Sequence, residues 1–137
     1  MDHDTGMQLV HDVQRIGHVP PTSIRVVHSG SVSIVTLTGD HDLCTAPALR
    51  DSLEQELAES RPCVIDLRGA TLVDSAILSV FSDASRLSRE RGLEMPVVLN
   101  GNRDSSVRRL VRATMVTLRM FDDLEEALGQ AQPAIPV

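Results

Sequence analysis

Residues 63–81, CVIDLRGATLVDSAILSVF, contain the transition that decides the fold class. The apolar run over residues 63–67 is typical of a short buried strand. A loop over residues 68–73 follows, and then Asp74 and Ser75, which are residue types that begin helices. From Ile77 onward, apolar residues recur at helical spacing towards Gly92, where the helix is expected to end. The stretch therefore predicts a strand, a loop and a helix in succession.

The same alternation continues in both directions along the chain. Apolar patterning predicts strands at residues 24–28, 32–38, 63–67, 95–99 and 117–120, and helices that begin near Thr45, Ser75, Ser105 or Ser106, and Asp122. Strand-helix-strand alternation implies parallel pairing through right-handed crossovers. We therefore expect a single α/β domain with a mixed β-sheet, an N-terminal antiparallel hairpin, a parallel centre and about four helices.

Residues 1–22 differ from the rest of the chain. They hold three of the five histidines and end at two consecutive prolines. Leu9, Val10, Val13 and Ile16 recur at roughly helical spacing, so this part is expected to be either one short helix or a flexible tail. The resulting division is an appendage at residues 1–22, a domain at 23–131 and a C-terminal tail at 132–137.

Composition excludes several classes of protein. All 13 basic residues of the 137 are arginine, and there is no lysine for a Walker A loop, a Schiff base or a receiver-domain pocket. A net charge of -6 and the absence of Trp and Tyr disfavour nucleic-acid binding. No apolar run has the length of a membrane span and no secretory signal is visible, so we expect a cytoplasmic protein without membrane insertion.

Two short motifs carry candidate chemistry. Asp74 and Ser75 start a predicted helix, where either residue can cap it, or where Ser75 can be phosphorylated and its phosphate held by free backbone N–H groups. Asp40, His41 and Asp42 offer metal ligands or an oriented base, but adjacent residues rarely point the same way, so a solvated loop is favoured. A serine hydrolase using Ser75 with His41 is disfavoured, because the flanking glycines of a nucleophile elbow are absent.

The remaining candidates are an arginine set and two cysteines. Five arginines surround the third predicted helix, and we favour a solvated face over a docking surface for an acidic partner or a phosphate: Arg103, Arg108, Arg109, Arg112 and Arg119. Two cysteines are too few for a disulfide scaffold or a structural zinc site. Cys63 is expected to be an inert core residue and Cys44 an exposed loop residue without a clear redox role.

Taken in order, the motifs resemble the STAS domain (sulfate transporter and anti-sigma factor antagonist), and most closely the stand-alone bacterial anti-sigma factor antagonists. The resemblance covers residues 24–130. Its motifs are Ile34-x-x-Leu37-x-Gly39-Asp40-His41-Asp42, Thr45-Ala46, Val64-Ile65-Asp66-Leu67, Leu72-Val73-Asp74-Ser75 and Val107-x-x-Leu110.

The resemblance implies a phosphorylation switch in which the protein is a regulator of transcription and not an enzyme. The unphosphorylated antagonist would bind an anti-sigma factor that is a serine kinase of the GHKL type, and phosphorylation of Ser75 would release it. A metal-dependent serine phosphatase would reset the switch. No cofactor or metal is implied. The implied partner-binding residues are Asp40, His41, Asp42, Thr45, Asp74, Ser75, Ala76 and Ile77.

The sequence departs from the family pattern at two places. Ile77 stands where the family has glycine, and residues 113–116 replace a later Ser-Gly-Leu. These changes predict an altered loop shape, and with it a divergent partner or changed phosphorylation of Ser75. The alternatives are a STAS scaffold or accessory subunit of a stress-signalling or transporter assembly and, from another class, the small serine hydrolase.

Overall fold

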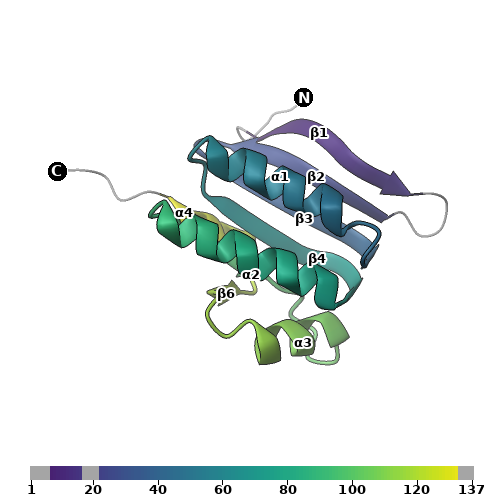
Figure 1. Ribbon diagram of the computed structural model, residues 1–137. Helices are drawn as coiled ribbons and strands as arrows, with labels where there is room; N and C mark the ends of the chain where they lie inside the picture. The colour runs from purple at the N-terminus through teal and green to yellow at the C-terminus, as the bar shows by residue number, and fades with distance from the viewer. Residues whose placement is uncertain (1–6, 17–21, 133–137) are drawn as a thin grey trace.

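The computed structural model describes residues 7–16 and 22–132, which form a six-stranded β-sheet with helices on both faces (Figure 1). The strands lie side by side in the order β1-β2-β3-β4-β5-β6. The elements in chain order are β1 (Met7–Ile16), β2 (Thr22–Ser29), β3 (Val32–His41), α1 (Ala46–Ala58), β4 (Cys63–Val73), α2 (Ser75–Glu90), β5 (Val97–Val98), α3 (Ser106–Thr114), β6 (Met120–Phe121) and α4 (Leu124–Ala131).

The sheet is mixed, as predicted. β1, β2 and β3 pair antiparallel, whereas β3, β4, β5 and β6 pair parallel. At the β2–β3 turn, Gly30 has a φ of 58°, which glycine adopts without the clash that a Cβ would cause. The antiparallel hairpin, the parallel centre and the four helices of the prediction are thereby confirmed.

The interpretation of residues 7–16 as a short helix is wrong, because they form strand β1 at the edge of the sheet. The register against β2 shifts twice, between Leu9 and His11 and between Asp12 and Gln14. Such bulges insert an extra residue and break the period of two that identifies a strand in sequence. Pairing also satisfies backbone groups along β2 that would otherwise be left as an open sheet edge.

Residues 68–73 are also not the expected loop, because β4 continues to Val73 alongside the end of β3. Two register shifts lie in this pairing, between Thr36 and Thr38 and between Gly39 and Asp40. They hide the alternation of buried and exposed residues in the second half of β4. The extension carries both strands to the same end of the sheet, where α1 and α2 begin.

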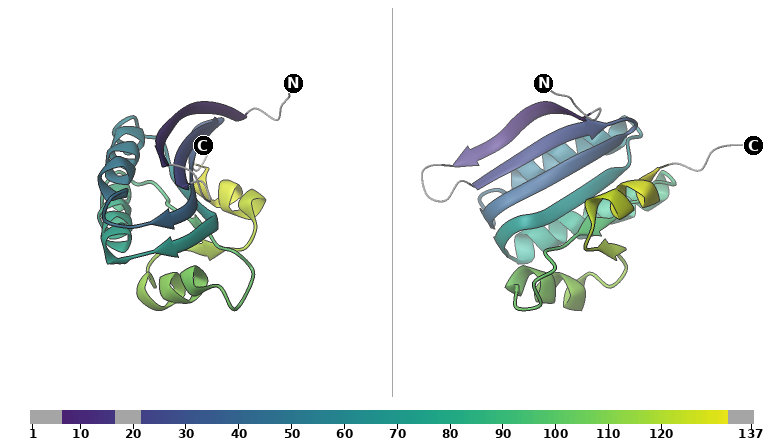
Figure 2. Two further views of the ribbon diagram at one scale, coloured as in Figure 1. Left: turned by 90° about the vertical axis from the view of Figure 1, so that its right-hand side faces the viewer. Right: turned by 180° about the vertical axis from the view of Figure 1, so that it is seen from behind.

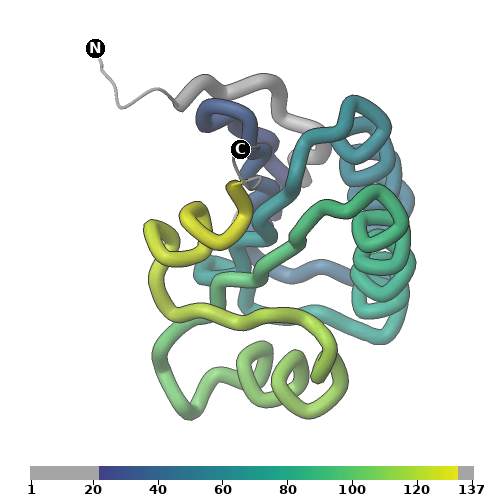
Figure 3. Tube along the Cα trace, turned by 90° about the vertical axis from the view of Figure 1, so that its left-hand side faces the viewer, coloured from purple at the N-terminus to yellow at the C-terminus, as the bar shows by residue number. Residues whose placement is uncertain are grey.

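The sheet divides the core into two layers, one under the helices of each face. Figures 2 and 3 show α1 and α2 together on one face of the sheet and α4 on the other. The larger layer contains the fully buried side chains of Leu49, Leu53, Ile77 and Phe81. The smaller layer packs Ala127 and Ala131 of α4 against one valine from each of three strands: Val32, Val64 and Val98. Each fully buried Leu, Ile or Phe contributes roughly 1.5–3 kcal/mol, so aliphatic residues compensate for the missing large rings.

The cysteines lie where the sequence predicts them. Cys44 is exposed and Cys63 is buried, and neither forms a disulfide. Burial raises the pKa of the Cys63 thiol to about 12. The thiol therefore stays protonated and unreactive at neutral pH.

Candidate functional site

The ends of β3 and β4 lie side by side and bring the predicted site residues to one end of the sheet. Asp40 is paired with Leu72, and His41 with Val73. After His41 the chain turns into α1, and directly after Val73 it enters the first turn of α2. We call this end of the molecule the Ser75 edge. Asp40, Asp42 and Asp74 therefore lie at the same end of the sheet.

Asp74 caps α2. It has extended backbone angles, and its Oδ1 accepts hydrogen bonds from the backbone N–H groups of Ala76 (3.0 Å) and Ile77 (3.2 Å). A side-chain cap of this kind satisfies donors that the first turn of a helix leaves without partners. Ser75 is the first residue of α2 and is exposed to solvent. The capping role therefore belongs to Asp74, and the hydroxyl of Ser75 stays accessible.

This cap reduces the number of free backbone N–H groups that a phosphate on Ser75 could bind. The sequence suggests that free N–H groups of the helix would hold the phosphate, but the carboxylate of Asp74 already occupies two of them. The helix dipole would still favour a negative group at this position. A phosphate would stand beside a carboxylate at the surface, and its main effect would be on whatever contacts this edge.

His41 is part of the interior and not of a solvated loop. Its side chain is fully buried, with Nε2 2.9 Å from the carbonyl oxygen of Thr38 and Nδ1 3.1 Å from Oγ1 of Thr45. Burial lowers the pKa of His41, so the neutral ring is favoured. In that form Nε2–H donates to the carbonyl and Nδ1 accepts from the threonine hydroxyl.

Thr45 links the two ends of the turn before α1. Its Oγ1 lies 3.2 Å from both the N–H and the carbonyl oxygen of Asp42, while Oδ1 of Asp42 accepts from the N–H of Cys44 at 2.8 Å. Thr45 is 1% exposed, whereas Asp42 is exposed. Of the residues predicted to bind a partner, His41 and Thr45 thus position the turn, and the two aspartates Asp40 and Asp42 reach the surface.

Ile77, which replaces the glycine of the family pattern, points into the core. It is fully buried in the layer beneath α1 and α2. Ala76 is half-buried and Ser75 is exposed. The larger side chain therefore anchors the first turn of α2 from below and leaves the hydroxyl of Ser75 at the surface. Ile77 itself is not available for direct contact with a partner.

Sequence reasoning missed the apolar part of the Ser75 edge. Leu43 is 72% exposed and Leu72 is 45% exposed. An open groove of about 340 Å³ runs between the first turns of α1 and α2, and its lining includes Leu43, Pro47, Ala76 and Val80. Leu43 lines this groove, and exposed apolar side chains of this kind are typical of protein-binding surfaces. The available signal was that Leu43 and Leu72 fall outside every predicted helix and strand.

The structure does not place His41, the base of the serine hydrolase alternative, so that it can activate Ser75. Both ring nitrogens of His41 are engaged away from Ser75. His28 lies at the far end of the sheet, with Nε2 2.7 Å from Oε1 of Glu56. Among the side chains of residues 22–132 no group of three or more His, Cys, Asp or Glu is placed to hold a metal ion. In the same residues no helix has the length and apolar character needed to cross a membrane.

Comparison with known proteins supports the fold described above. Residues 24–126 match the sequence model of a family described as "Mlab, STAS domain". No curated protein matches the sequence significantly.

Solved structures share the fold at low sequence identity. An anti-sigma factor antagonist from Mycobacterium paratuberculosis has a TM-score of 0.65 at 24% identity, covering 97% of this chain and 100% of that one. The phosphorylated form of the Bacillus cell fate determinant SpoIIAA has a TM-score of 0.62 at 12% identity, covering 78% and 97%. A sulfate transporter family protein from Wolinella succinogenes has a TM-score of 0.56 at 21% identity, covering 74% and 84%.

Proposed function

Because the chain belongs to the STAS-domain family, we propose that it is an anti-sigma factor antagonist whose binding is controlled by phosphorylation of Ser75. Its partner would be an anti-sigma factor of the GHKL serine kinase type, in the cytoplasm of a bacterium. The unphosphorylated protein would bind this kinase and free the sigma factor. A metal-dependent serine phosphatase would remove the phosphate.

The observation that carries the proposal is the exposed hydroxyl of Ser75 at the first position of α2. Asp74 fixes this turn through two backbone hydrogen bonds, and Ile77 anchors it to the core. The acceptor is therefore presented on a rigid element and not on a mobile loop. Leu43 and Leu72 supply apolar contact area on the same edge, as a protein partner needs and a small substrate does not.

The switch follows from the charges of the Ser75 edge. A phosphate adds about -1.5 to -2 charges at neutral pH. Asp40 and Asp42 are exposed there, and Asp74 directly precedes the acceptor. A partner that fits closely would have to desolvate this added charge beside existing carboxylates, which weakens binding. The phosphate would thus oppose the complex without unfolding the helix.

Phosphate mapping tests the proposal directly. The purified protein is incubated with ATP and a GHKL-type serine kinase with which it forms a complex, and modified residues are identified by mass spectrometry. We expect one phosphate, at Ser75. The Ser75→Ala variant should take up none, whereas Ser82→Ala, which removes an exposed serine about two turns later on α2 and outside the groove, should be modified like the wild type. Phosphate at another residue, or none with a kinase that forms a complex, would contradict the proposal.

A second candidate is a STAS domain that serves a transport assembly. It is favoured by the fold shared with the sulfate transporter family protein from Wolinella succinogenes. A pull-down with the wild type and the Ser75→Asp variant in parallel separates the candidates. A transport partner retained equally by both proteins would support this candidate over the phosphorylation switch.

A further inference from the structure

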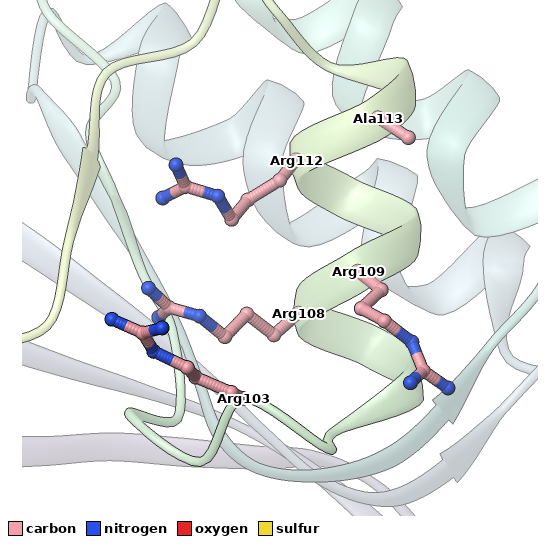
Figure 4. Close-up of a pocket in the computed structure, with 5 residues that line it drawn as sticks. All are labelled: Arg103, Arg108, Arg109, Arg112 and Ala113. Carbon is pink, nitrogen blue, oxygen red and sulfur yellow. The ribbon is translucent and has the colours of Figure 1, made fainter.

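Four arginines line an open hollow beside α3. The hollow has a volume of about 530 Å³ and is lined by Arg103, Arg108, Arg109, Arg112 and Ala113. Figure 4 shows the side chains of Arg103, Arg108 and Arg112 extending to the same side of the helix, while Arg109 extends to the other side. Because Arg108 and Arg112 are four residues apart, they lie one above the other on one helix face.

One of these arginines is fixed by the fold. The Nη1 atom of Arg108 donates to the carbonyl oxygen of Asn100 (3.1 Å) and to Oδ1 of Asp122 (2.6 Å), and its side chain is 15% exposed. These contacts join the loop after β5 to the loop after β6. Arg108 therefore ties together the two loops beside the hollow. Its guanidinium group already has a carboxylate partner, Asp122.

The other arginines carry charge that the fold does not neutralise. Arg103, Arg109 and Arg112 are exposed, and they form no ion pair with any carboxylate in the part of the chain that the structure describes. The chain as a whole has a net charge of -6. This part of the surface is therefore positively charged, although the chain as a whole is acidic.

The lining identifies the chemistry of the occupant. A guanidinium group binds carboxylate and phosphate groups with two parallel hydrogen bonds. Around the hollow there is no aromatic ring among the lining residues, so a nucleobase would find nothing to stack on. The net charge of the chain also opposes a long phosphate backbone. A carboxylate-rich segment of a protein fits the hollow better than a nucleotide or a nucleic acid does.

We propose that the hollow lined by Arg103, Arg108 and Arg112 is a docking surface for an acidic segment of a partner protein. The rest of the acidic surface repels such a segment, so the hollow would fix where and in which orientation the partner binds. The hollow is lined by residues of α3 and of the loop before it, and it shares no lining residue with the Ser75 edge. The inference does not depend on phosphorylation of Ser75.

Charge reversal with a matched control tests this surface. A decaglutamate peptide is titrated into the isotopically labelled full chain, and binding is followed by NMR. The Arg103→Glu/Arg112→Glu variant reverses the charge of the hollow, and Arg89→Glu/Arg91→Glu makes the same change in net charge at exposed arginines at the end of α2. We expect amide shifts around residues 103–112 and affinity lowered about tenfold or more in the first variant, because the guanidinium contacts are lost. The control variant should change the affinity by about twofold or less, since it alters only the long-range field.

Four outcomes would overturn the proposal. Equal loss of affinity in both variants would show that only net charge matters. Amide shifts elsewhere in the chain would place the peptide at another site. Tighter binding of a ten-residue oligothymidylate, or displacement of the peptide by inorganic phosphate at equal concentration, would assign the hollow to nucleic acid or to small anions.

Discussion

At the scale of single residues, the candidate site consists of exposed side chains that a partner can contact and buried side chains that position them. Ser75, Asp40 and Asp42 reach the surface, whereas His41 and Ile77 are fully buried and hold the two turns in place. The sequence could nominate these residues as candidates because their order matches a family pattern. It could not predict which ones face inward, because that depends on how β3 and β4 end together.

The cap at Asp74 makes a stability prediction at this scale. Asp74→Ala removes the acceptor for the N–H groups of Ala76 and Ile77, so we expect the free energy of unfolding to fall by about 0.5–2 kcal/mol. Urea unfolding measures this change. Asp74→Asn is the control, because asparagine caps about as well and removes only the charge. A loss as large in Asp74→Asn as in Asp74→Ala would contradict the capping role.

At the scale of elements, α1 is tied to the β2–β3 hairpin by a buried carboxylate that the sequence did not reveal. Glu56 is 2% exposed, and its Oε1 accepts from the hydroxyl of Ser33 at 2.6 Å and lies 2.7 Å from Nε2 of His28. Arg61 completes the cluster, with Nε 3.8 Å from Oε1 of Glu56 and 2.8 Å from Oγ of Ser33. The cluster lies at the end of the sheet opposite Ser75.

Removing the carboxylate of Glu56 should destabilise the fold strongly. Glu56→Ala leaves the partly buried Arg61 and His28 without their shared partner, and we expect a loss of about 3–5 kcal/mol. Glu54→Ala, at an exposed position on the same helix, should change stability by about 0.5 kcal/mol or less. Chemical unfolding of the two variants side by side is the measurement. Similar values for both would show that the cluster contributes little.

The helices and strands β2 and β3 were the most predictable elements, and β1 and the second half of β4 were the least. α2 was evident from a capping residue and from apolar residues at helical spacing that begin at Ile77. β1 was missed because its bulges imitate helical spacing, and its assignment depends on pairing with β2, which is not local in sequence. The second half of β4 was missed for the same reason.

At the scale of the whole molecule, an acidic chain presents two unlike surfaces that follow neighbouring parallel strands. The Ser75 edge combines carboxylates with the exposed Leu43 and Leu72, and the arginine hollow carries positive charge beside α3. The net charge of -6 predicts neither surface, because it averages over both. A partner with an apolar patch and an acidic segment at the matching spacing could engage both surfaces together.

The affinity of the protein for the proposed anti-sigma factor kinase, measured by calorimetry with and without phosphate on Ser75, tests the central claim most directly. The account predicts tight binding of the unphosphorylated protein and of Ser75→Ala, and affinity at least about tenfold lower for the phosphorylated protein. Ser75→Asp should also bind weakly, whereas Ser82→Asp, at an exposed serine on α2 outside the groove, should bind like the wild type. Equal affinity of the phosphorylated and unphosphorylated forms would contradict the account.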